Sequence, residues 1–122
     1  MKIKMDGVAE TLLITLYIRA KDAMDKNPIL NDQKSLEIMK QIEYDFEKFK
    51  KSKASYYGTL ARICTMDKEV KKFIAENPRC NIISVGCGLD TRFERIDNGQ
   101  IRWYNLDFPE VIELRSMFFE EH

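Results

Sequence analysis

The chain has 122 residues and a mass of 14.4 kDa, which is the size of one small domain. Hydrophobic residues make up 44% and charged residues 33%, a composition typical of a globular protein and not of a disordered one. Lys plus Arg and Asp plus Glu both number 20, so the net charge is zero. This balance argues against a dedicated nucleic-acid binder, because such proteins carry a basic surplus.

The N-terminal region shows no sign of membrane insertion or export. The longest apolar stretch, Leu12–Ile18, is interrupted by Thr15 and is far too short to cross a bilayer. Acidic residues at Asp6 and Glu10 follow the first methionine closely, unlike a secretion signal. The sequence therefore predicts a cytoplasmic protein with no membrane partner.

The cysteines and the histidine limit the chemistry. Cys64, Cys80 and Cys87 show no CxxC spacing, and the only histidine is His122 at the end of the chain. A zinc site needs more ligands at closer spacing, so we expect free thiols in a reducing compartment and no metal. Without a usable histidine there is no Ser-His or Cys-His pair, and the sequence assigns no catalytic residue.

Two helices are predicted in the first fifty residues. The first follows an apolar repeat at four-residue intervals and ends before Asn27–Pro28. Its apolar positions are Val8, Leu12, Leu16 and Ala20. The second is predicted from about Ser35 to Lys50. Its apolar face is formed by Met39, Ile42, Phe46 and Phe49.

The next stretch predicts a break in the helical pattern followed by two shorter helices. Tyr56-Tyr57-Gly58 interrupts the helical pattern, and Thr59–Thr65 forms a short helical segment. Asp67 is predicted to be the N-cap of a further helix, which ends at Asn77–Pro78.

The pattern changes to strands after residue 80. Ile82–Val85 is a short, mostly β-branched run between Pro78 and Gly86, which predicts a buried parallel strand. Ile101–Leu106 is the second strand, and Pro109 opens a helix at its favoured first turn. The predicted class is α/β, with a helical N-terminal cap over residues 1–80 and a Rossmann-like β-α-β-α portion over residues 81–122.

The candidate site lies where these two strands end. Gly86 and Gly88 form a Gly-x-Gly turn after the first strand, and Asp107 follows the second strand, 21 positions after Gly86. In Rossmann-like folds such glycines let a ligand approach the backbone, and the acidic residue accepts hydrogen bonds from ribose hydroxyls. Thr91 occupies the third glycine position of the dinucleotide fingerprint, so the fit to NAD is poor. S-adenosylmethionine has no pyrophosphate and does not need that glycine.

The same pattern has a purely structural interpretation. Gly86 and Gly88 can form a tight turn without any ligand, and Asp107 can cap the helix opened by Pro109. On the pattern alone, the two interpretations are equally supported.

Four strings extend the pattern to nearly the whole chain. They are IISVGCGLDTRFERI, YNLDFPEVIELR, GVAETLLITLYIRAKDAM and LARICTMDKEVKKFI. In order and spacing they resemble the leucine carboxyl methyltransferase family, which includes polyketide O-methyltransferases of the tetracenomycin type. The first string resembles the family's glycine motif, with Cys87 in place of alanine. The second resembles its acidic signature at the end of strand two.

The resemblance implies a class I S-adenosylmethionine-dependent methyltransferase that acts on a hydroxyl or carboxyl oxygen of a small molecule. It implies that Gly86 and Gly88 lie under the cofactor and that Asp107 holds the ribose hydroxyls. It also implies that Arg62 pairs with the methionine carboxylate. Without the family, Arg62 is better interpreted as a surface arginine. Asp90 and Arg92 are expected to brace the loop.

The chain departs from the family in length. Members are expected to be more than twice as long and to have a seven-stranded sheet, so we expect an N-terminal fragment that is inactive alone. The strand at Ile82–Val85 would then expose an edge. We expect the chain either to self-associate there or to depend on a missing C-terminal portion. The alternative is a truncated protein, derived from a methyltransferase, that binds a cofactor or a partner chain and catalyses nothing. A nicotinamide-binding domain is disfavoured by Thr91.

Overall fold

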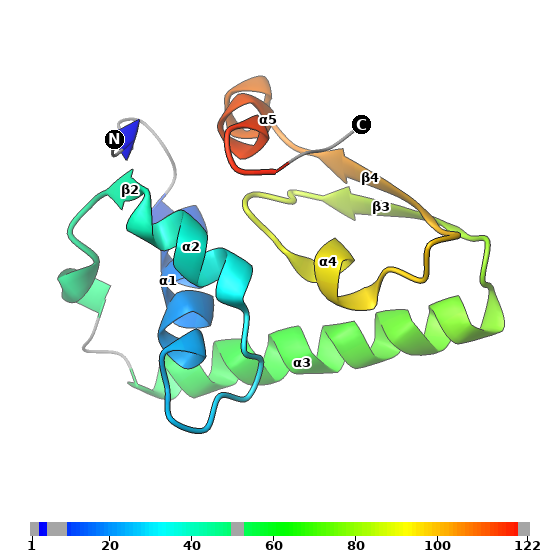
Figure 1. Cartoon of the computed structure of the whole chain (residues 1–122), viewed down its shortest axis with the longest axis horizontal. Helices are drawn as coiled ribbons and strands as arrows, with labels where there is room; N and C mark the ends of the chain where they lie inside the picture. The colour runs from blue at the N-terminus through cyan, green and yellow to red at the C-terminus, as the bar shows by residue number, and fades with distance from the viewer. Residues whose placement is uncertain (1–2, 5–9, 50–52, 120–122) are drawn as a thin grey trace. The chain divides into compact units, whose positions relative to one another are not determined.

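The structure is a computed structural model that describes residues 3–4, 10–49 and 53–119 (Figure 1). The chain forms two compact units, residues 1–64 and 65–122. The boundary falls within the long helix α3 (Lys53–Glu76). The sequence analysis divided the chain at residue 80 into a helical cap and a Rossmann-like portion. That division concerns function and not compactness, and it stays a prediction.

The first unit is mainly helical. Its core contains apolar side chains of α1 and α2 together with Leu60 of α3, and a parallel two-residue strand pair, β1 and β2, lies beside them. The predicted first helix is confirmed from Glu10 to Ala23, while Val8 lies outside the described residues. The elements before α3 are β1 (Ile3–Lys4), α1 (Glu10–Ala23), α2 (Gln33–Lys40), β2 (Ile42–Glu43) and the 3₁₀ turn η1 (Phe46–Phe49).

The helix predicted over Ser35–Lys50 is wrong beyond Lys40. The chain leaves the helix at Gln41, pairs as β2 and then forms η1. The reason is a cluster of aromatic rings whose centroids lie 5.3 to 6.3 Å apart. Aromatic residues lose rotamer freedom in a helix, so this cluster overrides a weak helical preference. The rings belong to Tyr17, Tyr44, Phe46 and Phe49.

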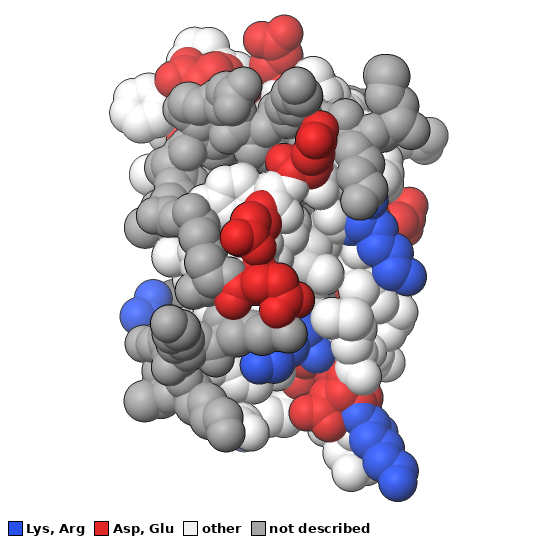
Figure 2. Space-filling view, turned by 90° about the vertical axis from the view of Figure 1, so that its left-hand side faces the viewer, with Lys and Arg blue, Asp and Glu red and all other residues white. Residues whose placement is uncertain are grey.

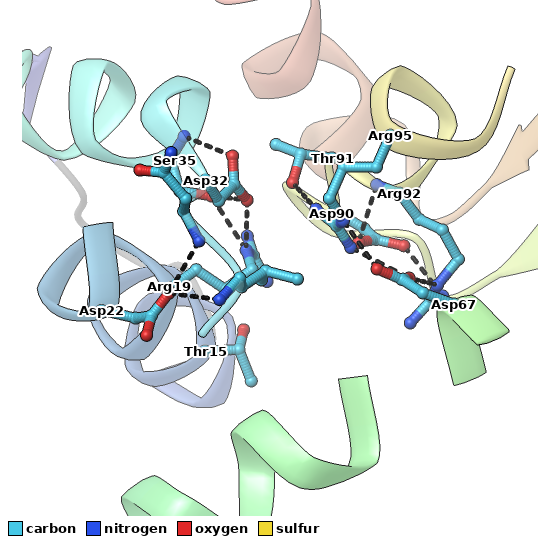
Figure 3. Close-up of polar contacts among 12 residues, drawn as sticks. Thr15, Arg19, Asp22, Asp32, Ser35, Asp67, Asp90, Thr91, Arg92 and Arg95 are labelled. Carbon is cyan, nitrogen blue, oxygen red and sulfur yellow. Dashed lines mark hydrogen bonds and ion pairs between the residues drawn. The ribbon is translucent and has the colours of Figure 1, made fainter. Parts of the chain in front are cut away.

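Two buried polar networks hold the first unit together (Figure 3). Arg19 Nε donates to Ser35 Oγ at 2.9 Å, and the Ser35 hydroxyl donates to Asp32, which also caps α2. The Asp22 carboxylate accepts the backbone N–H groups of Ile29, Leu30 and Asn31 at 2.8 to 2.9 Å. These networks satisfy buried charges and fix the turn between α1 and α2.

The Tyr56 hydroxyl gives the first unit a pH dependence at high pH. Burial, followed by the nearby carboxylates of Asp22 and Asp25, raises the pKa of Tyr56 to about 12 from 10.0. The unfolded chain therefore loses the Tyr56 proton at a lower pH than the folded chain does. The stabilisation of the folded state by the protonated hydroxyl is complete below pH 10 and is lost as pH rises to about 12. We expect Tyr56→Phe to flatten the fall in unfolding free energy over this range in urea titrations. Tyr104, an exposed tyrosine of the second unit, offers the control: Tyr104→Phe should keep the wild-type slope.

The second unit begins in the C-terminal half of α3 and contains a parallel strand pair. Its strands β3 and β4 run side by side in the same direction, with Asn81 opposite Arg102 and Val85 opposite Leu106 (Figure 1). Both predicted strands and the helix opened by Pro109 are confirmed, as is the α/β class. The elements are β3 (Asn81–Val85), α4 (Arg92–Ile96), β4 (Arg102–Leu106) and α5 (Pro109–Ser116).

The break predicted at Tyr56-Tyr57-Gly58 is wrong, because α3 runs without interruption from Lys53 to Glu76. A glycine inside a helix costs about 1 kcal/mol, and a long helix tolerates this cost. The predicted N-cap role of Asp67 is wrong for the same reason. Asp67 lies inside α3, and its carboxylate binds arginines of α4 instead.

The β3–β4 pair is covered on one face only within the second unit. Ile82 and Ser84 are half-buried, whereas Ile83 and Val85 expose 64% and 76% of their surface. Their partners on β4, Tyr104 and Leu106, are exposed as well. The prediction of a strand buried on both faces is therefore wrong for these positions, because alternate side chains point to opposite faces.

Candidate functional site

The glycine turn starts directly after β3. Gly86 and Gly88 have φ angles of 64° and 49°, a conformation that residues with a side chain rarely adopt. The N–H of Gly86 donates to Leu106 O at 2.7 Å, so the start of the turn is fixed to the end of β4. A Cβ added at Gly86 would meet no atom within 4 Å. The turn therefore presents bare backbone with open space beside it.

Asp107 connects the end of β4 to this turn. Its Oδ2 accepts the Gly88 N–H at 2.9 Å, and its Oδ1 accepts the Phe108 N–H at 2.7 Å. The helix cap of α5 is Phe108, without a side-chain cap bond, so the Asp107 carboxylate is directed to the glycine turn. Three of the residues predicted for the site, Gly86, Gly88 and Asp107, are thus brought together. The carboxylate keeps lone pairs for further donors.

Arg115 of α5 is a component of this region that the sequence analysis missed. Its guanidinium is buried, with 2% of the residue exposed, and lies 4.0 Å from the centre of the Phe119 ring. Its Nη1 donates to Gly88 O at 3.1 Å and to Asp90 O at 2.8 Å. The sequence signal for this burial was the position of Arg115 next to Leu114 and close to Phe118, two apolar residues.

A cluster of charged side chains supports the far end of the turn (Figure 3). Asp67 Oδ1 accepts Arg92 Nε at 2.7 Å, and Asp67 Oδ2 accepts Arg95 Nε at 2.7 Å. Arg92 Nη1 also donates to Asp90 Oδ2 at 3.2 Å, and Arg95 donates to the Thr91 hydroxyl. Asp90 and Arg92 therefore contact each other and brace the loop, as the sequence indicated.

Arg62 is the remaining residue of the predicted site. It lies exposed on α3, within the first unit, whereas the glycine turn and Asp107 belong to the second unit. Its pairing with a cofactor carboxylate stays a prediction.

The described residues bring no metal-binding cluster to the site. Cys64, Cys80 and Cys87 form no disulfide with one another, and Cys87, inside the glycine turn, is buried. Within residues 3–4, 10–49 and 53–119, no group of three or more His, Cys, Asp or Glu side chains is placed to hold a metal ion. The arrangement suits a nucleoside with adjacent hydroxyls, which needs a bare backbone and one carboxylate acceptor.

The surface charges agree with the neutral composition. On the face drawn in Figure 2, Lys and Arg side chains are scattered among Asp and Glu and do not gather into one basic patch. Among the helices in the described part of the chain, none has the length and apolar character needed to cross a membrane.

The chain is similar to methyltransferases along nearly its whole length. It is 35% identical over 120 residues to the tetracenomycin polyketide synthesis O-methyltransferase TcmP of Streptomyces glaucescens. It is 37% identical over 130 aligned residues to the S-adenosyl-L-methionine-dependent methyltransferase dpfgK of Gibberella zeae. Each match covers 98% of this chain and 44% of the relative, so the chain spans less than half the length of these relatives.

Family membership follows from the match to a family model. The family model for leucine carboxyl methyltransferase matches residues 12–122, and leucine carboxyl methyltransferase 1 of Candida albicans is 35% identical over 63 residues. That last match covers 49% of this chain and 17% of the relative. The chain belongs to the leucine carboxyl methyltransferase family, which confirms the resemblance seen in its motifs. No solved structure matches the chain significantly.

Proposed function

We propose that the chain is the N-terminal part of an S-adenosylmethionine-dependent O-methyltransferase. In this proposal residues 1–80 are a helical cap and residues 81–122 begin the Rossmann-like cofactor-binding domain. The observation that carries it is the Asp107 carboxylate, held 2.9 Å from the Gly88 N–H at the carboxyl ends of two parallel strands. Ligands of open α/β sheets bind at this end of the strands.

The residues present fit the cofactor. Gly86 has no Cβ and open space beside it, so a nucleoside can approach the backbone there. Asp107 has both oxygens oriented by backbone N–H groups and retains lone pairs for two ribose hydroxyls. Arg62 would pair with the methionine carboxylate through its planar guanidinium. When bound, S-adenosylmethionine supplies a methyl group on a sulfonium sulfur that is already a good leaving group.

The proposed acceptor is a hydroxyl or carboxyl oxygen of a small molecule. Support comes from TcmP, which is named an O-methyltransferase. Methyl transfer mainly requires that the acceptor oxygen is held in line with the methyl group and that water is excluded. A histidine base is therefore not required. We propose that the 122-residue chain binds cofactor but does not catalyse transfer alone, and that it works in the cytoplasm, where its thiols remain reduced.

Calorimetric titration with S-adenosylhomocysteine, which cannot transfer a methyl group, tests the proposal. We expect saturable 1:1 binding to the folded chain, and no binding of NAD, because Thr91 replaces the third glycine of the dinucleotide motif. Absence of S-adenosylhomocysteine binding to a chain shown by circular dichroism to be folded would reject the cofactor role for this chain.

A second candidate is a protein that binds another chain and catalyses nothing. It is favoured by the exposed apolar face of β3 and β4. The simplest way to distinguish the two candidate functions is to read the coding sequence beyond the His122 codon. Further strand-and-helix pattern in frame supports the enzyme, and a stop codon supports the partner-binding protein.

We expect a second copy of the chain to occupy this apolar face when no other chain does. Val85→Lys should shift the chain toward monomer in sedimentation at micromolar concentration, because it places a charge on this face at a position that is 76% exposed. Asn81→Lys is the matched control, since Asn81 is an exposed polar residue on the same face of the same strand. A wild-type chain that is already monomeric would contradict self-association.

A further inference from the structure

Arg115 is a buried cation in contact with the backbone of the glycine turn. Two of its hydrogen bonds reach carbonyl oxygens, Gly88 O at 3.1 Å and Asp90 O at 2.8 Å. Charged side chains are almost never fully buried without strong compensation, so both bonds carry more weight than exposed ones.

Gly88 is held at both of its polar backbone groups. Its N–H donates to Asp107 Oδ2 at 2.9 Å, and its carbonyl accepts from Arg115. A shift of Gly88 would therefore move it relative to the Asp107 oxygen that it contacts. Because the Phe108 N–H holds the other Asp107 oxygen, the carboxylate cannot follow the loop freely. The spacing between the turn and the carboxylate thus depends on the guanidinium.

Asp90 provides the second anchor of the loop. Its carbonyl accepts from Arg115, while its carboxylate accepts from Arg92 Nη1 at 3.2 Å. The turn is therefore fixed from α5 through Arg115 and from α4 through Arg92. A guanidinium suits this role because its donors lie in a rigid plane and can serve two carbonyls at once. The Phe119 ring, 4.0 Å from the guanidinium carbon, keeps that plane in place.

We propose that Arg115 is a positioning residue for cofactor binding, which sets the distance between the Gly88 backbone and the Asp107 carboxylate. This inference rests on the proposed function, because it assumes that S-adenosylmethionine binds at this turn. Arg115 does not touch the cofactor. It acts through Gly88 and Asp90, and its loss changes the binding surface even when the chain remains folded.

The test measures two quantities for each variant, its affinity for S-adenosylhomocysteine and its thermal unfolding midpoint. Arg115→Met removes both carbonyl bonds and is expected to weaken binding about tenfold or more. Arg115→Lys keeps the charge and part of the hydrogen bonding, so it should restore part of the loss. Methylguanidine added to Arg115→Ala should restore part of the affinity as well. Arg102→Met is the matched control, since Arg102 is exposed on β4, and its affinity should equal that of the wild type.

The outcomes distinguish failure of the positioning role of Arg115 from failure of the proposed function. If the wild type binds and Arg115→Met binds equally well, the positioning role is rejected and the proposed function stands. If affinity falls only as far as the folded fraction falls, with no rescue by lysine or methylguanidine, Arg115 is purely structural. If Arg115→Met does not fold, Arg115→Lys decides, and wild-type affinity in that variant rejects the role. If the wild type does not bind, the proposed function fails and this inference fails with it.

A second readout follows the loop directly. In ¹⁵N-labelled protein, Arg115→Met should shift the Gly88 amide resonance and speed its hydrogen exchange, because the turn loses one of its anchors. Arg102→Met should leave that resonance in place. An unchanged Gly88 amide in Arg115→Met would overturn the proposal whatever the binding data show.

Discussion

Asp67→Ala is expected to lower the free energy of unfolding by about 3 kcal/mol or more, because removal of one partner leaves buried charges uncompensated. Asp67 is 7% exposed, and its carboxylate accepts Arg92 Nε at 2.7 Å and Arg95 Nε and Nη2 at 2.7 and 3.1 Å. The alanine variant would leave two largely buried guanidinium groups without this shared partner. Urea denaturation followed by circular dichroism at pH 7 measures the loss.

Two further variants define what the Asp67 carboxylate contributes. Asp67→Asn keeps the shape and one acceptor oxygen but removes the charge, so an intermediate loss is expected. Glu69→Gln removes an exposed carboxylate from the same helix and should change stability by less than about 0.5 kcal/mol. A denaturation midpoint of Asp67→Ala equal to that of the wild type would show that the two arginines find other partners.

The parts of the fold that the sequence predicted well are those with local causes. β3 and β4 follow from β-branched and aromatic runs bounded by glycine, proline and aspartate, and Pro109 fixes the start of α5. The contact between Gly88 and Asp107 could also be predicted from the sequence. Parallel strands place their carboxyl ends at one edge of the sheet, so a turn and an acid that follow two such strands must meet there.

The parts that the sequence analysis missed depend on contacts between residues far apart in the chain. Asp67 has the sequence features of a helix cap, but its partner Arg95 lies 28 positions away and only the folded chain brings them together. The helix predicted beyond Lys40 failed because Phe46 and Phe49 pack against Tyr17. Arg115 was missed because an arginine on a short helix is usually exposed.

Asp107→Ala is expected to abolish measurable binding of S-adenosylhomocysteine, with a loss of about 100-fold or more. The estimate follows from two hydrogen bonds to a charged acceptor, each contributing about 1.5 to 3 kcal/mol, where 1.4 kcal/mol corresponds to a factor of ten. The variant also removes the acceptor of the Gly88 N–H, so the turn loses its support from the β4 side. Asp107→Asn keeps one acceptor oxygen without the charge and should show an intermediate loss. Calorimetric titration at a temperature at which every variant is folded gives the comparison.

The matched control for Asp107 is Asp97→Ala. Asp97 is an exposed aspartate of the same unit, and its Oδ1 accepts the Gly99 N–H at 2.8 Å, so it has a comparable bond to a glycine backbone. It lies in the loop after α4 and not at the carboxyl end of a strand, and its loss should leave S-adenosylhomocysteine affinity unchanged. Equal losses in Asp97→Ala and Asp107→Ala would mean that loop stability alone controls binding. A loss confined to Asp107→Ala would show that losing a hydrogen bond to a glycine N–H elsewhere in the unit does not weaken binding, and it would support Asp107 as the carboxylate of the cofactor site.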